Sequence, residues 1–332
     1  MRVATGIAIL AVGATLGLTA TPALAEWHPT KPIEFVATAG PGGGTDNLAR
    51  TIQSIITKHK LTDQPVIVVN KGGGSGAEGY TYGKALAGDP YKVIFGTSNA
   101  WNQPLVSKVA FKHTDLTPIA ALASDEFLLW VKIDAPYKTA KDYAEAAKKR
   151  EFKMAGAQSK DTDETLTRLI EKAVGVKIAY IPFKSGADAA VQLAGGHVDS
   201  NVNNPSESIG QWRGGTQRPL CVFNRKRLAA GAKITKTESW SDVPTCVESG
   251  LDVPEFSQPR TVWLPGGATP EQVAFYVELM KKVQAQPEWK EYIERTSQTG
   301  LFLSGDAFQK FMADDLERNR KVAAEQGWLV GG

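Results

Sequence analysis

The sequence predicts an α/β protein of two lobes, and three observations support this. Units of strand, glycine-rich loop and helix repeat in the first third, which is typical of a mostly parallel sheet with helices on its faces. A similar alternation restarts in the middle of the chain. The length is 332 residues, which at about 150 residues per domain suggests two domains. With 42% hydrophobic and 22% charged residues, the composition is globular and argues against disordered, collagen-like and coiled-coil proteins.

The first lobe begins with three predicted strands, over residues 33–37, 66–70 and 93–97. Glycine-rich loops at 40–44 and 72–76 follow the first two strands. Each loop precedes a predicted helix, and in the first helix the apolar residues recur at helical spacing on one face.

The second lobe contains five further predicted strands and two helices. The strands are expected over 127–131, 152–156, 178–183, 199–202 and 218–223, and the helices over 139–150 and 163–174. The C-terminal third adds a strand at 261–265 and amphipathic helices at 270–284 and 305–324. We expect residues 26–127 and 256–332 to form the first lobe. Residues 128–255 would form the second lobe, inserted into the first.

The first 25 residues read as a signal peptide. Arg2 precedes an apolar stretch over residues 3–18, and the small residues Ala23 and Ala25 fit a cleavage site after Ala25. A membrane anchor is the alternative, but the stretch is short for a span of about 20 residues and no basic cluster follows it. No cysteine for lipid attachment lies near the cut. We therefore expect an exported, soluble chain that begins at Glu26.

Few residues could hold a metal or form a crosslink. Cys221 and Cys246 are the two cysteines, and an exported protein could join them in a disulfide. The alternative is two buried thiols that never meet. The four histidines show no metal-binding spacing, so no metal and no cofactor is expected. The net charge of +3 argues against nucleic-acid binding by bulk charge.

The glycine-rich loops are the candidate anion sites. Backbone N–H groups converge in such loops, and the following helix presents its positive end. The loop at residues 41–46 is neither a P-loop nor a dinucleotide fingerprint. The second loop matches the fingerprint literally at Gly74, Gly76 and Gly79, but export argues against a dinucleotide. Tight strand–helix turns are the structural alternative for both loops. No nucleophile motif of the GxSxG type occurs, so nucleophilic catalysis has little support.

Seven segments in order carry a resemblance to a known family. They are Pro29-Thr30-Lys31-Pro32-Ile33, the loop from Pro41 to Arg50, Asn70-Lys71-Gly72-Gly73, Ile181-Pro182-Phe183-Lys184-Ser185-Gly186, Leu193-Ala194-Gly195-Gly196-His197-Val198-Asp199, Asn203-Asn204-Pro205-Ser206-Glu207, and Asp242-Val243-Pro244-Thr245 with Glu248 and Gly250. Together, behind a signal peptide, they resemble the periplasmic substrate-binding proteins of tripartite tricarboxylate transporters, the TctC or Bug family.

The resemblance implies a two-lobed periplasmic-binding-protein fold of type II that closes on a small carboxylate. It implies a periplasmic monomer without catalytic activity that delivers its ligand to tripartite tricarboxylate-type membrane transporter subunits. The expected ligand-binding residues are Gly42, Gly43, Gly44, Thr45, Asp46, Thr97, Ser98, Gln158, Ser159, Thr162, Asn204, Ser206 and Arg260.

Two segments depart from the family pattern. The loop at residues 158–166 lacks the residues that many members carry there. Arg260 stands near a position where members often have an aromatic pair. An arginine at the lobe junction could pair with a second carboxylate, which would favour a dicarboxylate ligand. The alternative is a surface or lobe-bridging arginine.

Two other functions stay open from the sequence. One is an exported hydrolase or lyase that uses the same cleft, and the other is a binding protein that acts as a sensor for a signalling partner. Citrate-like, aliphatic and aromatic carboxylates are all candidate ligands.

Overall fold

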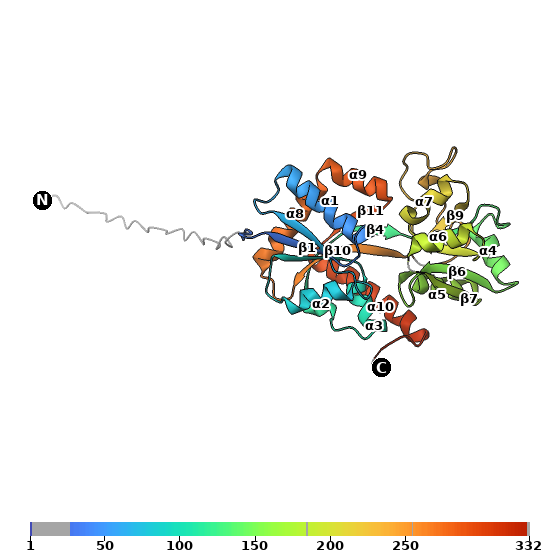
Figure 1. Ribbon diagram of the computed structural model, residues 1–332, viewed down its shortest axis with the longest axis horizontal. Helices are drawn as coiled ribbons and strands as arrows, with labels where there is room; N and C mark the ends of the chain where they lie inside the picture. The colour runs from blue at the N-terminus through green and yellow to red at the C-terminus, as the bar shows by residue number, and fades with distance from the viewer. Residues whose placement is uncertain (2–26, 184, 254, 331–332) are drawn as a thin grey trace.

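A computed structural model describes Met1 and residues 27–183, 185–253 and 255–330. The predicted cleavage site after Ala25 lies outside the described residues. Two lobes lie side by side in the described chain (Figure 1), and each is built around one sheet. The predicted two-lobed α/β architecture is confirmed.

The first sheet has six strands in the order β11-β4-β10-β3-β1-β2. Their bounds are β1 Ile33–Ala37, β2 Val66–Asn70, β3 Lys92–Gly96, β4 Leu116–Glu126, β10 Ser257–Pro265 and β11 Thr299–Leu303. The second sheet has five strands in the order β7-β6-β8-β5-β9. Their bounds are β5 Leu128–Lys132, β6 Phe152–Ala157, β7 Ile178–Phe183, β8 Ser200–Asn203 and β9 Gln217–Val222.

Strand pairing is mixed, so the prediction of a mostly parallel sheet is wrong. β1 pairs in parallel with β2 and β3, and β6 pairs in parallel with β7 and β8. β10 runs antiparallel to both β3 and β4, and β5 runs antiparallel to β8 and β9. The reason is the insertion of one lobe into the other: β4 leads out of the first sheet and β10 returns to it in the opposite direction.

Helices cover both faces of each sheet. In the first lobe, α1 Gly44–His59, α8 Pro270–Gln284 and α9 Pro287–Thr296 contribute to the core on one face. On the other face, α2 Ala77–Ala85, α3 Asn99–Val106 and α10 Gly305–Glu325 do the same. In the second lobe, α4 Ala140–Ala147 and α5 Thr162–Val174 lie on one face, with α6 Gly186–Ala194 and α7 Pro205–Arg213 on the other.

Side chains along the strands alternate between the cores on the two faces of a sheet. In β1, Ile33, Phe35 and Ala37 belong to one core and Val36 belongs to the core on the opposite face, as expected for side chains that alternate along a strand. Trp101, Trp130 and Trp263 are at most 1% exposed, so these tryptophans are core residues rather than a ligand platform.

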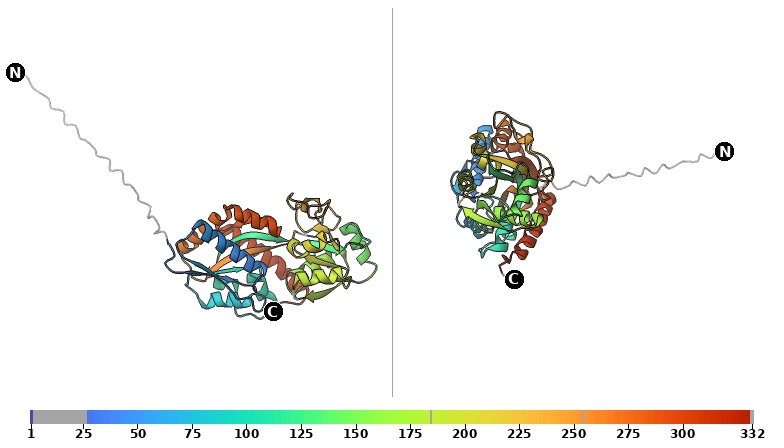
Figure 2. Two further views of the ribbon diagram at one scale, coloured as in Figure 1. Left: turned by 45° about the horizontal axis from the view of Figure 1, so that its top comes forward. Right: turned by 90° about the vertical axis from the view of Figure 1, so that its right-hand side faces the viewer.

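β4 and β10 run from the first lobe toward the second (Figure 1). β4 ends at Glu126, and β5 of the other sheet begins two residues later at Leu128. The strands of the first sheet all lie within residues 26–127 and 256–332, and those of the second sheet all lie within residues 128–255. The exact lobe limits stay a prediction. The C-terminal helix α10 passes along the lobe junction (Figure 2), and its Glu325 pairs with Lys172 of α5 at 2.7 Å.

Several elements of the structure differ from the prediction. The structure contains six elements that the sequence did not predict: β4, β11, α3, α6, α7 and α9. The C-terminal third therefore holds three helices rather than two. Predicted ends also shift: α4 covers Ala140–Ala147 rather than residues 139–150.

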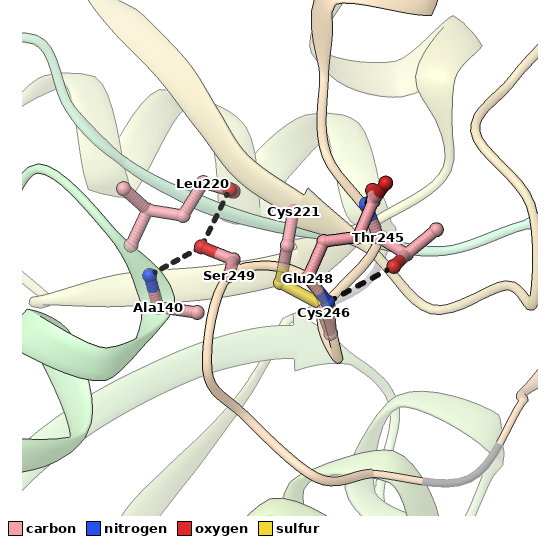
Figure 3. Close-up of a disulfide and its surroundings, with 7 residues drawn as sticks. All are labelled: Ala140, Leu220, Cys221, Thr245, Cys246, Glu248 and Ser249. Atoms are coloured by element: carbon pink, nitrogen blue, oxygen red, sulfur yellow. Dashed lines mark hydrogen bonds between the residues drawn. A yellow bond between two sulfur atoms is a disulfide. The ribbon is translucent and has the colours of Figure 1, made fainter.

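The two cysteines are joined in the structure. The Sγ atoms of Cys221 and Cys246 are bonded at 2.12 Å, which ties β9 to a turn further along the chain (Figure 3). In that turn, the Ser249 hydroxyl accepts a hydrogen bond from the Ala140 N–H at 2.8 Å. The crosslinked segment therefore also holds the start of α4.

Candidate functional site

A polar cavity of about 60 Å³ opens between the two lobes. From the first lobe, its lining includes Ser98, Asn99 and Asn102 at the start of α3, together with Asp315 and Asn319 of α10. From the second lobe, the lining includes Gln158, Ser159, Lys160, Asp161 and Thr162. Because both lobes supply walls, a ligand held here would bridge them.

The second-lobe wall is a loop with an unusual backbone. Gln158 and Lys160 have positive φ values of 54° and 57°, a conformation that side-chain-bearing residues adopt at a cost of about 1–3 kcal/mol and that clusters at functional sites. The Tyr180 hydroxyl donates to the carbonyl oxygens of Ala157 at 2.9 Å and Gln158 at 2.8 Å. Asp163 accepts from the Ala157 N–H at 2.7 Å. These bonds hold the loop in place. Burial raises the pKa of Asp163 well above its usual range.

The first-lobe wall is positioned by Asp315, a buried residue of α10. Its Oδ2 accepts from Trp101 Nε1 at 2.8 Å and from Asn102 Nδ2 at 3.0 Å. The bonds fix the polar face of α3 toward the cavity. Ser98 in this wall is a predicted site residue, whereas Asn99, Asn102 and Gln103 were not predicted, although they follow a strand at the spacing of one helix face. Nothing in the sequence pointed to Asp315, because α10 reads as an ordinary amphipathic helix.

Two side-chain contacts join the lobes beside the cavity. Ser75 of the second glycine loop donates its hydroxyl proton to Gln158 Oε1. Gln258 of β10 donates from Nε2 to Thr162 Oγ1 at 3.0 Å. The second glycine loop and β10 therefore both reach the second-lobe loop.

The first glycine loop is organised by Asp46. Its carboxylate accepts from the Gly42 N–H at 2.8 Å, from Asn70 Nδ2 at 2.8 Å, and from Arg50 Nε at 3.0 Å. Burial raises the pKa of Asp46, but the hydrogen bonds from Arg50, Gly42 and Asn70 outweigh it, and the net pKa is below its usual range. Asp46 shapes the loop through these bonds, while Gly42 and Gly44 stay exposed.

The second glycine loop packs directly on the first. A Cβ added to Gly72 would lie 2.5 Å from the Ala39 carbonyl carbon, so only glycine permits this approach. Asn70 Nδ2 also donates to the Ala39 carbonyl oxygen at 3.0 Å. Asn70 thus links the two loops, a structural role that its place in the family motif did not reveal.

Arg260 lies at the lobe junction against the first glycine loop. Its Nη1 donates to Thr45 Oγ1 at 3.2 Å, and a Cβ added to Gly44 would lie 2.4 Å from Arg260 Nη2. Nη2 forms an ion pair with Asp125 of β4 at 2.5 Å, with both side chains largely buried. Arg260 therefore faces the first glycine loop, but its charge is already met by the carboxylate of Asp125.

Two more carboxyl groups lie near this ion pair. Burial raises the pKa of Glu126 to about 7 and the pKa of Glu207 to about 7. Asn204, before α7, donates from Nδ2 to the Glu126 carbonyl oxygen at 2.8 Å, and its N–H donates to Glu207 Oε2 at 3.1 Å. Asn204 thereby connects the end of β4 to the start of α7.

The structure distributes the predicted site residues over four places. Ser98, Gln158, Ser159 and Thr162 line the cavity. Gly42, Gly43, Gly44, Thr45, Asp46 and Arg260 gather at the start of α1. Asn204 and Ser206 lie at the start of α7. Thr97 follows β3, and its N–H donates to the Tyr80 hydroxyl oxygen at 3.0 Å. Their roles in ligand binding stay predictions.

The described residues contain neither a helix suited to span a membrane nor a cluster of metal-binding side chains. In the described part of the chain, no helix is both long and apolar enough to cross a membrane. Nor do the described residues bring together three or more histidine, cysteine, aspartate or glutamate side chains that could hold a metal ion.

Comparisons with known proteins agree on one family. The model of the tripartite tricarboxylate transporter family receptor matches residues 48–328. Protein BugT of Bordetella pertussis is 26% identical over 322 residues, covering 95% of this chain and 94% of BugT.

Two solved structures share the fold. A TctC solute-binding protein from Polaromonas, solved without ligand, superimposes with a TM-score of 0.75 at 28% identity and covers 90% of this chain and 100% of its own. An R. palustris protein solved with adipate superimposes with a TM-score of 0.74 at 26% identity, covering 90% of this chain and 98% of its own.

Proposed function

This chain belongs to the tripartite tricarboxylate transporter receptor family, and we propose that it captures a small organic carboxylate in the periplasm. It then delivers the ligand, as a monomer and without catalysis, to membrane transporter subunits of the tripartite tricarboxylate type. The exported form begins at Glu26, after removal of the signal peptide.

The observation that carries this proposal is the polar cavity between the lobes. Its walls include the start of α3, at Ser98-Asn99, and a helix start favours anions. The start of α1, with the exposed Gly42 and Gly44, lies next to β10, which also reaches the cavity. A carboxylate is the small organic group that such donors fit.

Closure of the lobes on the ligand follows from this arrangement. Only a few segments connect the sheets, and closure around a ligand is common for such domains. The contacts from Ser75 to Gln158 and from Gln258 to Thr162 are the contacts that a closed form would keep. The adipate bound in the R. palustris relative supports a carboxylate as the ligand class.

The sensor reading and the hydrolase reading are weaker alternatives. A signalling role would use the same binding step as transport. The two roles differ only in the partner protein that the closed form contacts. A hydrolase or lyase requires turnover, which an assay of candidate esters and acids on the purified protein would detect.

A cavity-filling variant tests the location of the site. Ser159 is exposed and lines the cavity, so Ser159→Trp should lower carboxylate affinity at least tenfold in calorimetric titrations. Ser54→Trp, on an exposed position of α1, is the matched control and should bind as the wild type does. Equal affinity of both variants for every carboxylate that the wild type binds would place the ligand elsewhere.

A further inference from the structure

The ion pair between Arg260 and Asp125 occupies the place where a second ligand carboxylate was expected. Nη2 of Arg260 and Oδ2 of Asp125 are 2.5 Å apart, and the side chains are 12% and 5% exposed. Gln298 of the segment before β11 donates from Nε2 to Asp125 Oδ1 at 2.5 Å. Both carboxylate oxygens of Asp125 are therefore engaged, and Arg260 already has an anionic partner.

Arg260 nevertheless faces the side where a ligand would bind. Its guanidinium lies against Gly44 and Thr45, the first two residues of α1. Two residues earlier on β10, Gln258 reaches Thr162 in the cavity wall. The guanidinium thus adds its positive charge to the positive end of α1, and Asp125 is the group that balances it.

The other charged groups around the cavity include two carboxylates. Asp161 and Asp315 belong to its lining, where Lys160 is the cation, and Asp315 is paired with Arg318 of α10. Glu207 of the second lobe interacts electrostatically with both Arg260 and Asp125. A second ligand carboxylate would meet these like charges, and a buried charge without a partner is costly.

We infer that Asp125 is a specificity-determining residue that neutralises Arg260 and restricts the site to ligands with one carboxylate. The inference rests on the proposed function and narrows its substrate class to monocarboxylates. The single carboxylate is held by the first glycine loop, and the uncharged remainder of the ligand extends toward the polar side chains of the cavity. Asp125 acts through Arg260 and needs no contact with the ligand.

Matched ligand pairs test this inference by calorimetric titration. Hexanoate is compared with adipate, and lactate with malate, because each pair differs mainly by one carboxylate. The wild-type protein should bind the monocarboxylate of at least one pair ten or more times more tightly than its dicarboxylate. In Asp125→Asn, which frees Arg260, this ratio should fall at least tenfold in favour of the dicarboxylate. Glu126→Gln, which removes the neighbouring carboxyl group and leaves the ion pair intact, should keep the wild-type ratio.

A double variant covers the case in which Asp125→Asn fails to fold around an unpaired arginine. Asp125→Asn with Arg260→Gln removes both charges together and should keep the wild-type preference for the monocarboxylate. Two results would overturn the inference. One is a wild type that prefers the dicarboxylate, together with a double variant that loses this preference. The other is a ratio of monocarboxylate to dicarboxylate affinity that Asp125→Asn leaves unchanged. If the wild type binds no member of either pair, nor any other carboxylate, the proposed function itself fails.

Discussion

Glu126 lies at the end of β4 and is 3% exposed. Burial of its carboxyl group lowers the stability of the folded chain. Burial and the nearby Glu255 and Asp125 carboxylates raise its pKa from 4.5 to about 7, despite hydrogen bonds that lower it. Between these two pH values the folded protein retains a proton that the unfolded chain releases. The free energy of unfolding therefore falls as pH rises through this window.

Glu126→Gln should remove this loss, because a neutral amide needs no proton. We expect the variant to match the wild type near pH 4.5 and to exceed its free energy of unfolding at pH 8 by about 3 kcal/mol. Urea denaturation at both pH values measures the difference. Glu151→Gln, at an exposed position, is the control without an effect. A variant less stable than the wild type at pH 8 would mean that Glu126 is ionised and well compensated.

At the scale of elements, the disulfide holds β9 to the turn at residues 245–249. It spans 25 residues of sequence, and a crosslink of that length stabilises a fold by about 3 kcal/mol in the chain-entropy account. Cys221→Ala with Cys246→Ala should lower the free energy of unfolding by about that amount. Carboxylate affinity should stay unchanged, because neither cysteine lines the cavity. Urea denaturation and calorimetry report the two quantities, and an unchanged urea midpoint would assign the bond no part in stability.

The elements that the sequence predicts well are those with local signals. α8 begins at Pro270 as expected, because Thr269 accepts from the Gln272 N–H in the structure and proline suits the first turn. β4 has no such signal, since it ends in Ser124, Asp125 and Glu126. These polar residues are buried because distant partners such as Arg260 and Gln298 meet them.

The candidate site also contains a part that the sequence predicts from local signals and a part that it does not. The loops at residues 42–46 and 158–162 are visible as glycine-rich or polar segments between a strand and a helix. Arg260 could be placed at the lobe junction through the resemblance, but its partner could not, because β4 and β10 become neighbours only in the folded sheet. Asp315 likewise acquires its role only when α10 packs on α3.

The whole molecule consists of two lobes whose facing loops meet across a polar cavity. The strands β4 and β10 and the helix α10 link the lobes (Figure 1), so a ligand that contacts both walls stabilises the closed arrangement. Its binding energy adds to the stability of the folded chain, because the unfolded chain has no such site.

Thermal denaturation of the protein from Glu26 onward, with mono-, di- and tricarboxylates added one at a time, tests the central claim most directly. A carboxylate at about 100 times its Kd adds about 2.7 kcal/mol to the free energy of unfolding. We predict that at least one small carboxylate raises the melting temperature in a concentration-dependent way, and that Ser159→Trp reduces the rise at the same carboxylate concentration. A melting temperature that no carboxylate changes would contradict the account.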